Sequence, residues 1–147
     1  MTTAVQPDQR KLALALTILR ISLGVFLLIW SLEKFFLPQS TIGIWKGFYL
    51  IKIGESMPYI IGAVETLVSV AIILGFMRTW SYGIGLAINT VSVLSTWKQL
   101  IDPWGLIFDT RNNHLFLAGV PMLAGFVVLF MLRDWDIWTL DGRKKAP

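Results

Sequence analysis

The chain has 147 residues, a formal net charge of +4 and 55% hydrophobic residues. The length allows one domain, but this hydrophobic share and a mean hydropathy of +0.66 are too high for an ordinary soluble protein of this size. The absence of cysteine excludes disulfides, thiolate zinc sites and iron–sulfur ligation by this chain. Nucleic acid is not an expected partner, because no basic stripe with interleaved aromatics lies outside the apolar runs.

The first apolar run predicts a retained membrane span over residues 12–36. The run follows a polar start and is too long for the apolar region of a cleaved signal peptide. Arg20 lies inside it, and an arginine at the centre of a membrane helix costs about 2.5–3.5 kcal/mol on insertion scales. The surrounding Leu, Ile, Val and Phe residues outweigh that cost.

Residues 39–56 mix aromatic side chains with lysines, which is typical of a short interfacial or re-entrant helix. Three more apolar runs predict spans over 58–77, 80–100 and 114–132. Arg78 and Thr79 alone would form the turn between the second and third spans. Pro121 is expected to kink the fourth. The prediction is an all-α integral membrane protein, a four-helix bundle in one domain over residues 1–147.

An even number of spans places both termini on one side of the membrane. By the positive-inside rule that side is the cytoplasm, because it holds more of the Lys and Arg residues. On that side lie Arg10, Lys11, Arg78, Arg133, Arg143, Lys144 and Lys145; on the other lie Lys34, Lys46, Lys52, Lys98 and Arg111. The expected location is a cell membrane such as the bacterial inner membrane.

Polar and small residues recur at helical spacing in each span and predict the packed faces of the bundle. Arg20 would lie about 12 Å from the cytoplasmic edge and Glu65 about 10–11 Å from the outer edge, at 1.5 Å per residue. In a hydrocarbon core of about 30 Å these depths are similar, and Asn89 lies at a comparable depth. The sequence therefore predicts an Arg20–Glu65 pair beside Asn89.

Two interpretations of this polar centre remain open. In one, Arg20, Glu65 and Asn89 fix the helix register. In the other, they line a pocket for a ligand headgroup such as a quinone, or relay protons. His114 is the only histidine and could be an axial ligand, although no second histidine is present. No spacing typical of a metal site, a cofactor held by the chain or a catalytic centre appears.

Three segments carry a resemblance to a known family: "LRISLGVFLLIWSLEKFF", "GAVETLVSVAIILGFMRT" and "LRDWDIWTLD". Over residues 12–141 the chain resembles the DoxX-like membrane proteins. The matching positions are Arg20, Gly24, Lys34, Glu65, Gly75 and Arg78. Trp30 departs from the pattern, because a small residue is common there.

The resemblance implies four helices and a relation to the small subunit of thiosulfate:quinone oxidoreductase. The expected function is an accessory subunit of a quinone-linked redox complex, with the lipid bilayer and other membrane subunits as partners. The alternative is a structural or assembly subunit without a redox role. A small transporter or an independent enzyme is less expected, since no inverted repeat appears.

Overall fold

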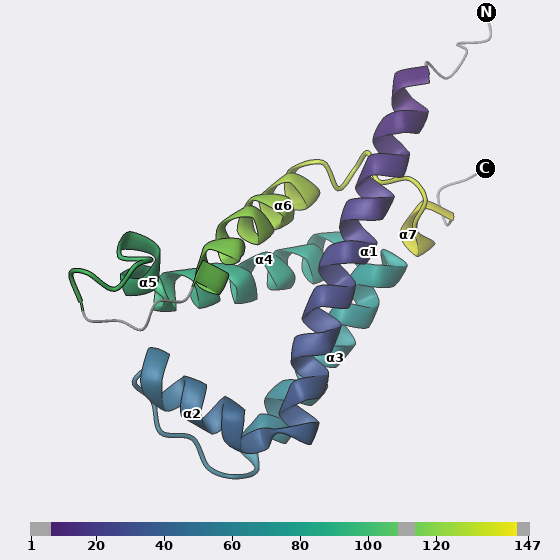
Figure 1. Cartoon of the computed structure of the whole chain (residues 1–147). Coiled ribbons are helices and arrows are strands. Elements are labelled where there is room, and N and C mark those ends of the chain that lie inside the picture. The colour runs from purple at the N-terminus through teal and green to yellow at the C-terminus, as the bar shows by residue number, and fades with distance from the viewer. Residues whose placement is uncertain (1–6, 109–113, 144–147) are drawn as a thin grey trace, which may run out of the picture.

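A computed structural model of the chain describes residues 7–108 and 114–143, drawn as a ribbon in Figure 1. Within these residues the structure is all-α and has no strands. Its elements in chain order are α1 (Pro7–Phe36), α2 (Pro38–Phe48), α3 (Met57–Leu74), α4 (Arg78–Ser95), α5 (Trp97–Ile101), the 3₁₀ helix η1 (His114–Ala118), α6 (Gly119–Met131) and α7 (Leu140–Arg143).

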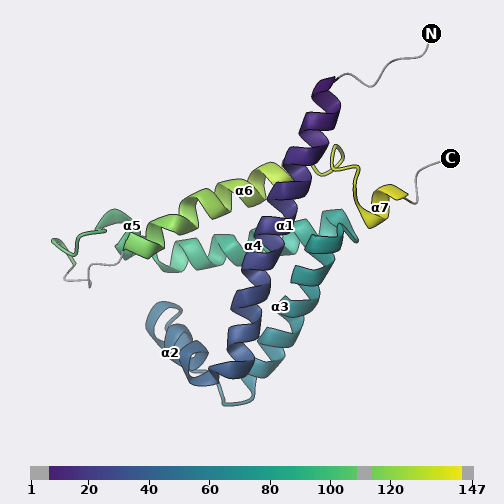
Figure 2. The ribbon, with the colours of Figure 1, turned by 45° about the vertical axis from the view of Figure 1, so that its right-hand side comes forward.

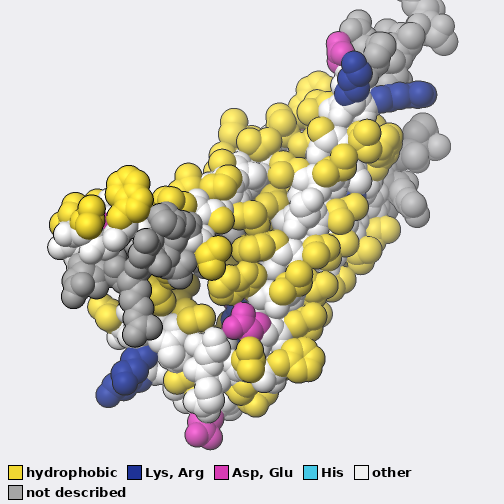
Figure 3. Space-filling model, viewed as in Figure 1, with side chains coloured by type: hydrophobic (Ala, Val, Ile, Leu, Met, Phe, Trp, Pro, Cys, Tyr) yellow, Lys and Arg dark blue, Asp and Glu magenta, His cyan; other side chains and the backbone are white. Residues whose placement is uncertain are grey.

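Two helices are long and apolar enough to cross a membrane: α1 from Asp8 to Phe36, and α3. The apolar stretch Leu115–Met131 is shorter. In the most apolar windows of α1 and α3, 33% and 22% of residues are buried, so most of their apolar side chains face outward, unlike those of a soluble core helix. Together with Figure 3, in which hydrophobic side chains cover much of the visible face, these helices indicate a membrane protein. That α4 also spans the membrane stays a prediction.

The long helices associate as two pairs. α1 packs along α3 and α4 packs along α6, while fewer contacts join α3 to α4 and α1 to α6. Figures 1 and 2 show the second pair running at a wide angle to the first. The structure therefore confirms the all-α class, and its long helices form two crossed pairs; a bundle of four membrane-spanning helices stays a prediction. The buried core lies where they meet and consists of Leu23, Leu27, Ile72, Tyr82, Phe126 and Leu129.

Glycine sets the close approach of α1 and α3. A Cβ atom added at Gly24 would lie 2.5 Å from Ile73 Cγ1 and 3.2 Å from the Ile73 backbone nitrogen. At the other end of the pair, a Cβ at Gly62 would lie 3.1 Å from the Ser31 carbonyl oxygen. These two contacts fix the antiparallel register: residue 24 lies opposite residue 73, and residue 31 opposite residue 62.

The α3–α4 turn differs from the prediction. α3 ends at Leu74, and Gly75 adopts the left-handed conformation with φ 64°. The N–H of Gly75 donates to the Ile72 carbonyl and that of Phe76 to the Ala71 carbonyl, at 3.0 and 2.9 Å, which is the Schellman pattern of a glycine-terminated helix. Arg78 is already the first residue of α4, so the predicted Arg78-Thr79 turn is wrong.

Pro121 does not kink a long fourth helix. The predicted span 114–132 divides into η1 and α6, and Pro121 lies in the first turn of α6. Backbone N–H groups there have no intrahelical acceptor, so a proline removes no hydrogen bond. Between the first two predicted spans the expected helix is present as α2, and its position at the membrane interface stays a prediction.

Candidate functional site

The register of α1 on α3 separates Arg20 from Glu65. Arg20 lies beside the end of α3, because its Nη1 atom would be 2.7 Å from a Cβ at Gly75. Glu65 lies ten positions earlier in α3, which is about 15 Å along a helix axis. The predicted Arg20–Glu65 pair is therefore wrong. The depth estimate assumed that the two spans begin at opposite membrane edges, whereas α1 runs well past the end of α3.

Arg20 instead meets an acidic residue outside the predicted spans. Its Nη1 atom lies 3.2 and 3.1 Å from the two carboxylate oxygens of Asp136, and its Nη2 donates to the Trp138 carbonyl at 2.9 Å. Tyr82 of α4 donates its hydroxyl to the same carboxylate at 2.7 Å. The Arg20 and Asp136 side chains are only 5% and 0% exposed. This buried pair joins the segment after α6 to α1 and α4.

A second arginine ties the same segment to the start of α4. Arg78 donates from Nη1 to the carbonyls of Arg133 and Asp136, both at 2.7 Å. The Arg78 backbone N–H donates to Asp141 Oδ2 at 2.9 Å, and the Asp141 N–H donates to the Gly75 carbonyl. We call residues 133–141 the clasp, because they bind the middle of α1, the end of α3 and the start of α4 together.

Glu65 pairs with Lys34 at the other end of the α1–α3 pair. Lys34 Nζ lies 2.6 Å from Glu65 Oε2, and the side chains are 11% and 16% exposed. Lys34 also donates to the Trp30 carbonyl at 3.2 Å. A salt bridge this far from water is retained only with good geometry, since each isolated charge would cost several kcal/mol to bury.

Hydroxyl groups extend this pair into a polar layer between α1 and α3. Thr66 donates to Ser31 Oγ at 2.9 Å, and Ser69 donates to the Glu65 carbonyl at 2.6 Å. Ser31 and Ser69 are fully buried. The predicted polar stripe of the second span therefore does face the packed side, as helical spacing required.

Asn89 is the third predicted residue, and it lies apart from Arg20. It is on the face of α4 that also carries Gly85, where an added Cβ would lie 2.8 Å from both Ile72 Cδ1 and Phe126 Cε1. Asn89 is one helical turn further on, 5% exposed. Its Oδ1 atom has no hydrogen-bond partner within the described part of the chain.

α3, which carries Glu65, and α4, which carries Asn89, are close together at one end and separate toward the other. Ile72 and Gly85 touch where α3 meets α4, and Figures 1 and 2 show the two helices separating from there toward α2. At the far end Tyr49, which follows α2, places its hydroxyl 3.4 Å from Ser92 Oγ of α4. We call the space bounded by these residues the wedge.

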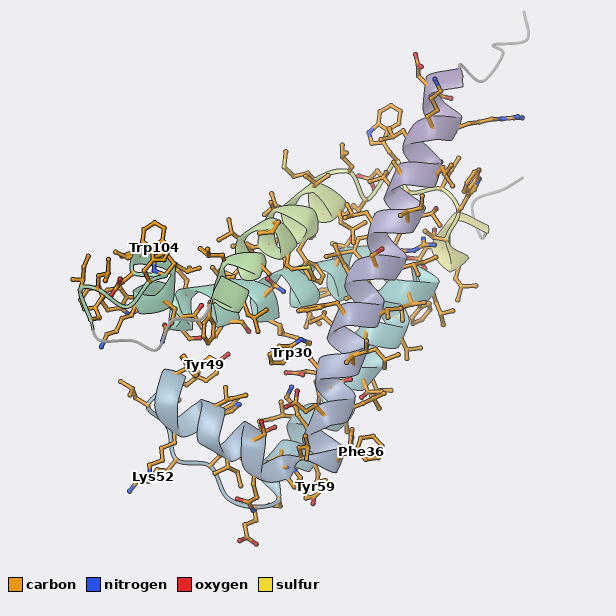
Figure 4. The ribbon with its side chains drawn as sticks, in the orientation of Figure 1. Trp30, Phe36, Tyr49, Lys52, Tyr59 and Trp104 are labelled. Atoms are coloured by element: carbon orange, nitrogen blue, oxygen red, sulfur yellow. The ribbon has the colours of Figure 1, made fainter. Side chains whose placement is uncertain are left out.

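The side chains around the wedge include both charged and aromatic groups. Figure 3 shows the surface hollowed between the α2 segment and the α4–α6 arm, with an acidic side chain at the edge of the hollow. Figure 4 shows Trp30 of α1 and Tyr49 extending into this opening from opposite sides. Trp30 is 46% exposed, so its ring is available to a molecule that enters.

The backbone of His114 begins η1, and its side chain lies outside the described residues. Among the residues that the structure describes, no three His, Cys, Asp or Glu side chains are grouped as metal ligands. The two clusters are therefore distinct in character. The Arg20–Asp136 pair is enclosed by the clasp, whereas Lys34 and Glu65 pair between α1 and α3 and Asn89 is buried on α4.

Sequence reasoning missed Asp136 and the pairing of Lys34. Asp136 lies in the segment "RDWD" after the last apolar run, where an acid is ordinarily solvated. The available signal was that Arg20 needed a counter-charge and that this short segment is rich in both charges and tryptophan. Lys34 was expected to lie at a span end, yet Glu65 comes within reach through the α1–α3 register.

Comparison with known proteins adds one finding. Residues 15–98, more than half of the chain, match the model of the DoxX family. The matched region runs from α1 into α5 and includes Arg20, Lys34, Glu65 and Asn89, but it ends before the clasp. Searches of curated proteins and of solved structures find no match.

Proposed function

This chain belongs to the DoxX family, and from that premise we propose that it is a small accessory subunit of a quinone-linked redox complex in the membrane. The observation that carries the proposal is the polar wedge in an otherwise apolar surface. Lys34 of α1 and Glu65 of α3 form an ion pair, and Asn89 is a buried polar side chain of α4. Ionisable groups inside a membrane protein are costly and usually mark a functional site.

The accessory role follows from what the chain can supply. Without cysteine it cannot ligate an iron–sulfur cluster, so partner subunits would carry the electrons. The chain would contribute an apolar surface and a polar site open to the bilayer. Apolar side chains exposed on α1 and α3 offer contact to lipid or to such partners, among them Ile18, Ile29, Val64 and Leu67.

The proposal is tested by purifying the tagged full chain from its native membranes in a mild detergent. The expected result is stoichiometric co-purification of further membrane subunits, together with quinone in the organic extract. A stable, partnerless monomer without quinone would contradict it. An unrelated tagged membrane protein of similar size serves as the purification control.

A matched pair of variants tests the site within that complex. Glu65→Gln leaves Lys34 without its counter-charge, so quinone-dependent turnover of the complex should fall while partner subunits still co-purify. Glu55→Gln makes the same change at an exposed position and should leave turnover unchanged. Equal turnover in both variants would remove Glu65 from the proposed site.

The clasp favours a second candidate, a structural or assembly subunit. Arg20 and Tyr82 both bond to Asp136 inside the fold, and such internal bonding suits a scaffold better than a ligand site. If this role is correct, loss of the chain lowers the amount of partner subunits in the membrane. Turnover per remaining complex would stay the same, and the purified complex would hold no quinone near this chain.

A further inference from the structure

The loop after α5 presents apolar side chains outward. We call residues 102–108, which read "DPWGLIF", the apolar loop. Leu106 is 82% exposed, Ile107 70% and Trp104 63%, and residues 103–108 contain no charged side chain. Figure 4 shows Trp104 at the far end of the α4–α6 arm, away from the α1–α3 pair. Large apolar side chains gathered on a surface mark a contact with a protein or with a membrane.

The backbone of the apolar loop is bonded inward. Asp102 is followed by a proline and then, at the fourth position, by Gly105, a pattern typical of a type I turn. The Gly105 N–H donates to the Asp102 carbonyl at 3.2 Å. The Asp102 carboxylate accepts from the N–H groups of Leu106, Ile107 and Phe108 at 2.8, 2.7 and 2.8 Å, and Asp102 is only 4% exposed. Three consecutive backbone donors are therefore satisfied inside, while the apolar side chains lie outside.

This arrangement suits lipid better than water. A solvated loop can leave its backbone N–H groups to water. In the apolar part of a bilayer each unsatisfied group costs free energy, so it has to be bonded within the protein. One buried carboxylate that accepts from three consecutive amides meets this requirement for residues 106–108.

The position of the loop favours lipid over a protein partner. It begins two residues after the predicted span 80–100, so a crossing α4 places it at the membrane interface, where tryptophan is enriched. Lys98 Nζ lies 5.7 Å from the centre of the Trp97 ring, and a lysine at the end of a span can reach the lipid headgroups. Protein interfaces usually add hydrogen bonds around an apolar centre, but the amides of residues 106–108 are already bonded to Asp102.

We propose that the apolar loop inserts into the membrane interface, with Leu106 and Ile107 in lipid and Asp102 holding their backbone amides. The loop thereby anchors the far end of the α4–α6 arm in the bilayer. This role goes beyond the proposed function, because it requires neither a quinone nor a partner subunit.

The test uses a single cysteine, which is specific because the natural chain has none. Leu106→Cys carries a nitroxide label, and the full chain is reconstituted as a single copy in nanodiscs of phosphatidylcholine and phosphatidylglycerol. Electron paramagnetic resonance compares collisions of the label with oxygen, which concentrates in lipid, and with a nickel chelate, which stays in water. Oxygen collisions should exceed nickel collisions at residue 106. Glu55→Cys, at an exposed position outside the helices, is the control, and nickel collisions should dominate there.

A second variant tests the role of Asp102. Asp102→Asn in the labelled Leu106→Cys chain weakens the acceptor of the three amides, so the ratio of oxygen to nickel collisions should fall. Asp134→Asn, at an exposed position, should leave the ratio unchanged.

Three results would overturn the proposal. Nickel collisions that dominate at residue 106 would place the loop in water, and few collisions with either reagent would place it against protein. An unchanged ratio in Asp102→Asn would remove Asp102 from the anchor. Since the chain is tested without partner subunits, co-purification and quinone content succeed or fail separately.

Discussion

Both buried cations of α1 have a specific counter-charge. Arg20 has Asp136, and Lys34 has Glu65. Without a counter-charge, the cost of removing its charge from water would make Arg20 or Lys34 unfavourable in an apolar helix. At the scale of single residues, Asp136 and Glu65 therefore offset the free-energy cost of burying Arg20 and Lys34 in α1.

The Arg20–Asp136 pair gives the first prediction. Asp136→Asn leaves a buried guanidinium without its counter-charge and weakens the acceptor of the Tyr82 hydroxyl. Breaking one side of a buried pair typically costs about 3–5 kcal/mol, so thermal unfolding in detergent should occur at a clearly lower temperature. Asp134→Asn, at an exposed position two residues away, is the control. Equal unfolding temperatures for the two variants would contradict the structural role.

Asp102 gives a pH-dependent prediction. Burial acts to raise the pKa of this carboxyl group, but backbone N–H groups of Phe108, Ile107, Leu106 and Gly105 outweigh it and lower the pKa below its ordinary value. A lowered pKa in the folded state means that the carboxylate stabilises the loop above its ordinary pKa. The stabilisation is lost as the pH falls through the lower value.

The measurement is amide hydrogen exchange of the loop after α5. Asp102 accepts from the N–H groups of Leu106, Ile107 and Phe108 at 2.8, 2.7 and 2.8 Å. Asp102→Asn should reduce the protection of these amides at neutral pH. At a pH below the lowered pKa the variant and the wild type should be alike. Unchanged protection at neutral pH would show that the three hydrogen bonds do not hold the loop.

At the scale of helices, hydropathy and spacing predicted most of what the structure contains. The long apolar runs gave α1 and α3, and the polar stripe of residues 62–69 does face α1. Which residues meet across helices was not predictable, because it depends on a register that Gly24 and Gly62 set by close contact. The register that would pair Arg20 with Glu65 differs from the observed one by about ten residues. In the observed register Lys34 lies within reach of Glu65 instead.

The end of α3 gives the prediction at this scale. Gly75→Ala places a side chain at φ 64° and a Cβ atom 2.5 Å from Thr139 of the clasp. A non-glycine residue in a sparsely populated backbone region costs about 1–3 kcal/mol, and the contact adds to it. Chemical denaturation should show this loss. Gly54→Ala, where a Cβ would have nothing within 4 Å, should change stability little; equal losses would contradict the turn argument.

At the scale of the whole molecule, the two crossed helix pairs share a small core and leave apolar faces outward. By the positive-inside rule, the distribution of lysine and arginine predicts that both termini lie in the cytoplasm. The same distribution predicts that the segment after α2 lies outside. This orientation requires α4 to cross the membrane; α4 has 18 residues, and several of its side chains are polar.

Reporter fusions test the orientation. Alkaline phosphatase, which is active only after export, should be inactive when fused at the C-terminal end and active when fused after Lys52. A green fluorescent reporter fused at the C-terminal end should be bright, because it folds in the cytoplasm. The opposite pattern at both positions would show an inverted topology, and phosphatase activity at both positions would show an odd number of spans.

The clasp has a consequence for the order in which the chain is made. Arg20 enters the membrane early, yet its carboxylate partner is 116 residues later in the chain. Until the ribosome has released that segment, the guanidinium of the first helix must be held by water, lipid headgroups or an insertion factor. Assembly of this small protein is therefore completed from its last-made end, and a product cut short before Asp136 would carry an unneutralised arginine in its oldest helix.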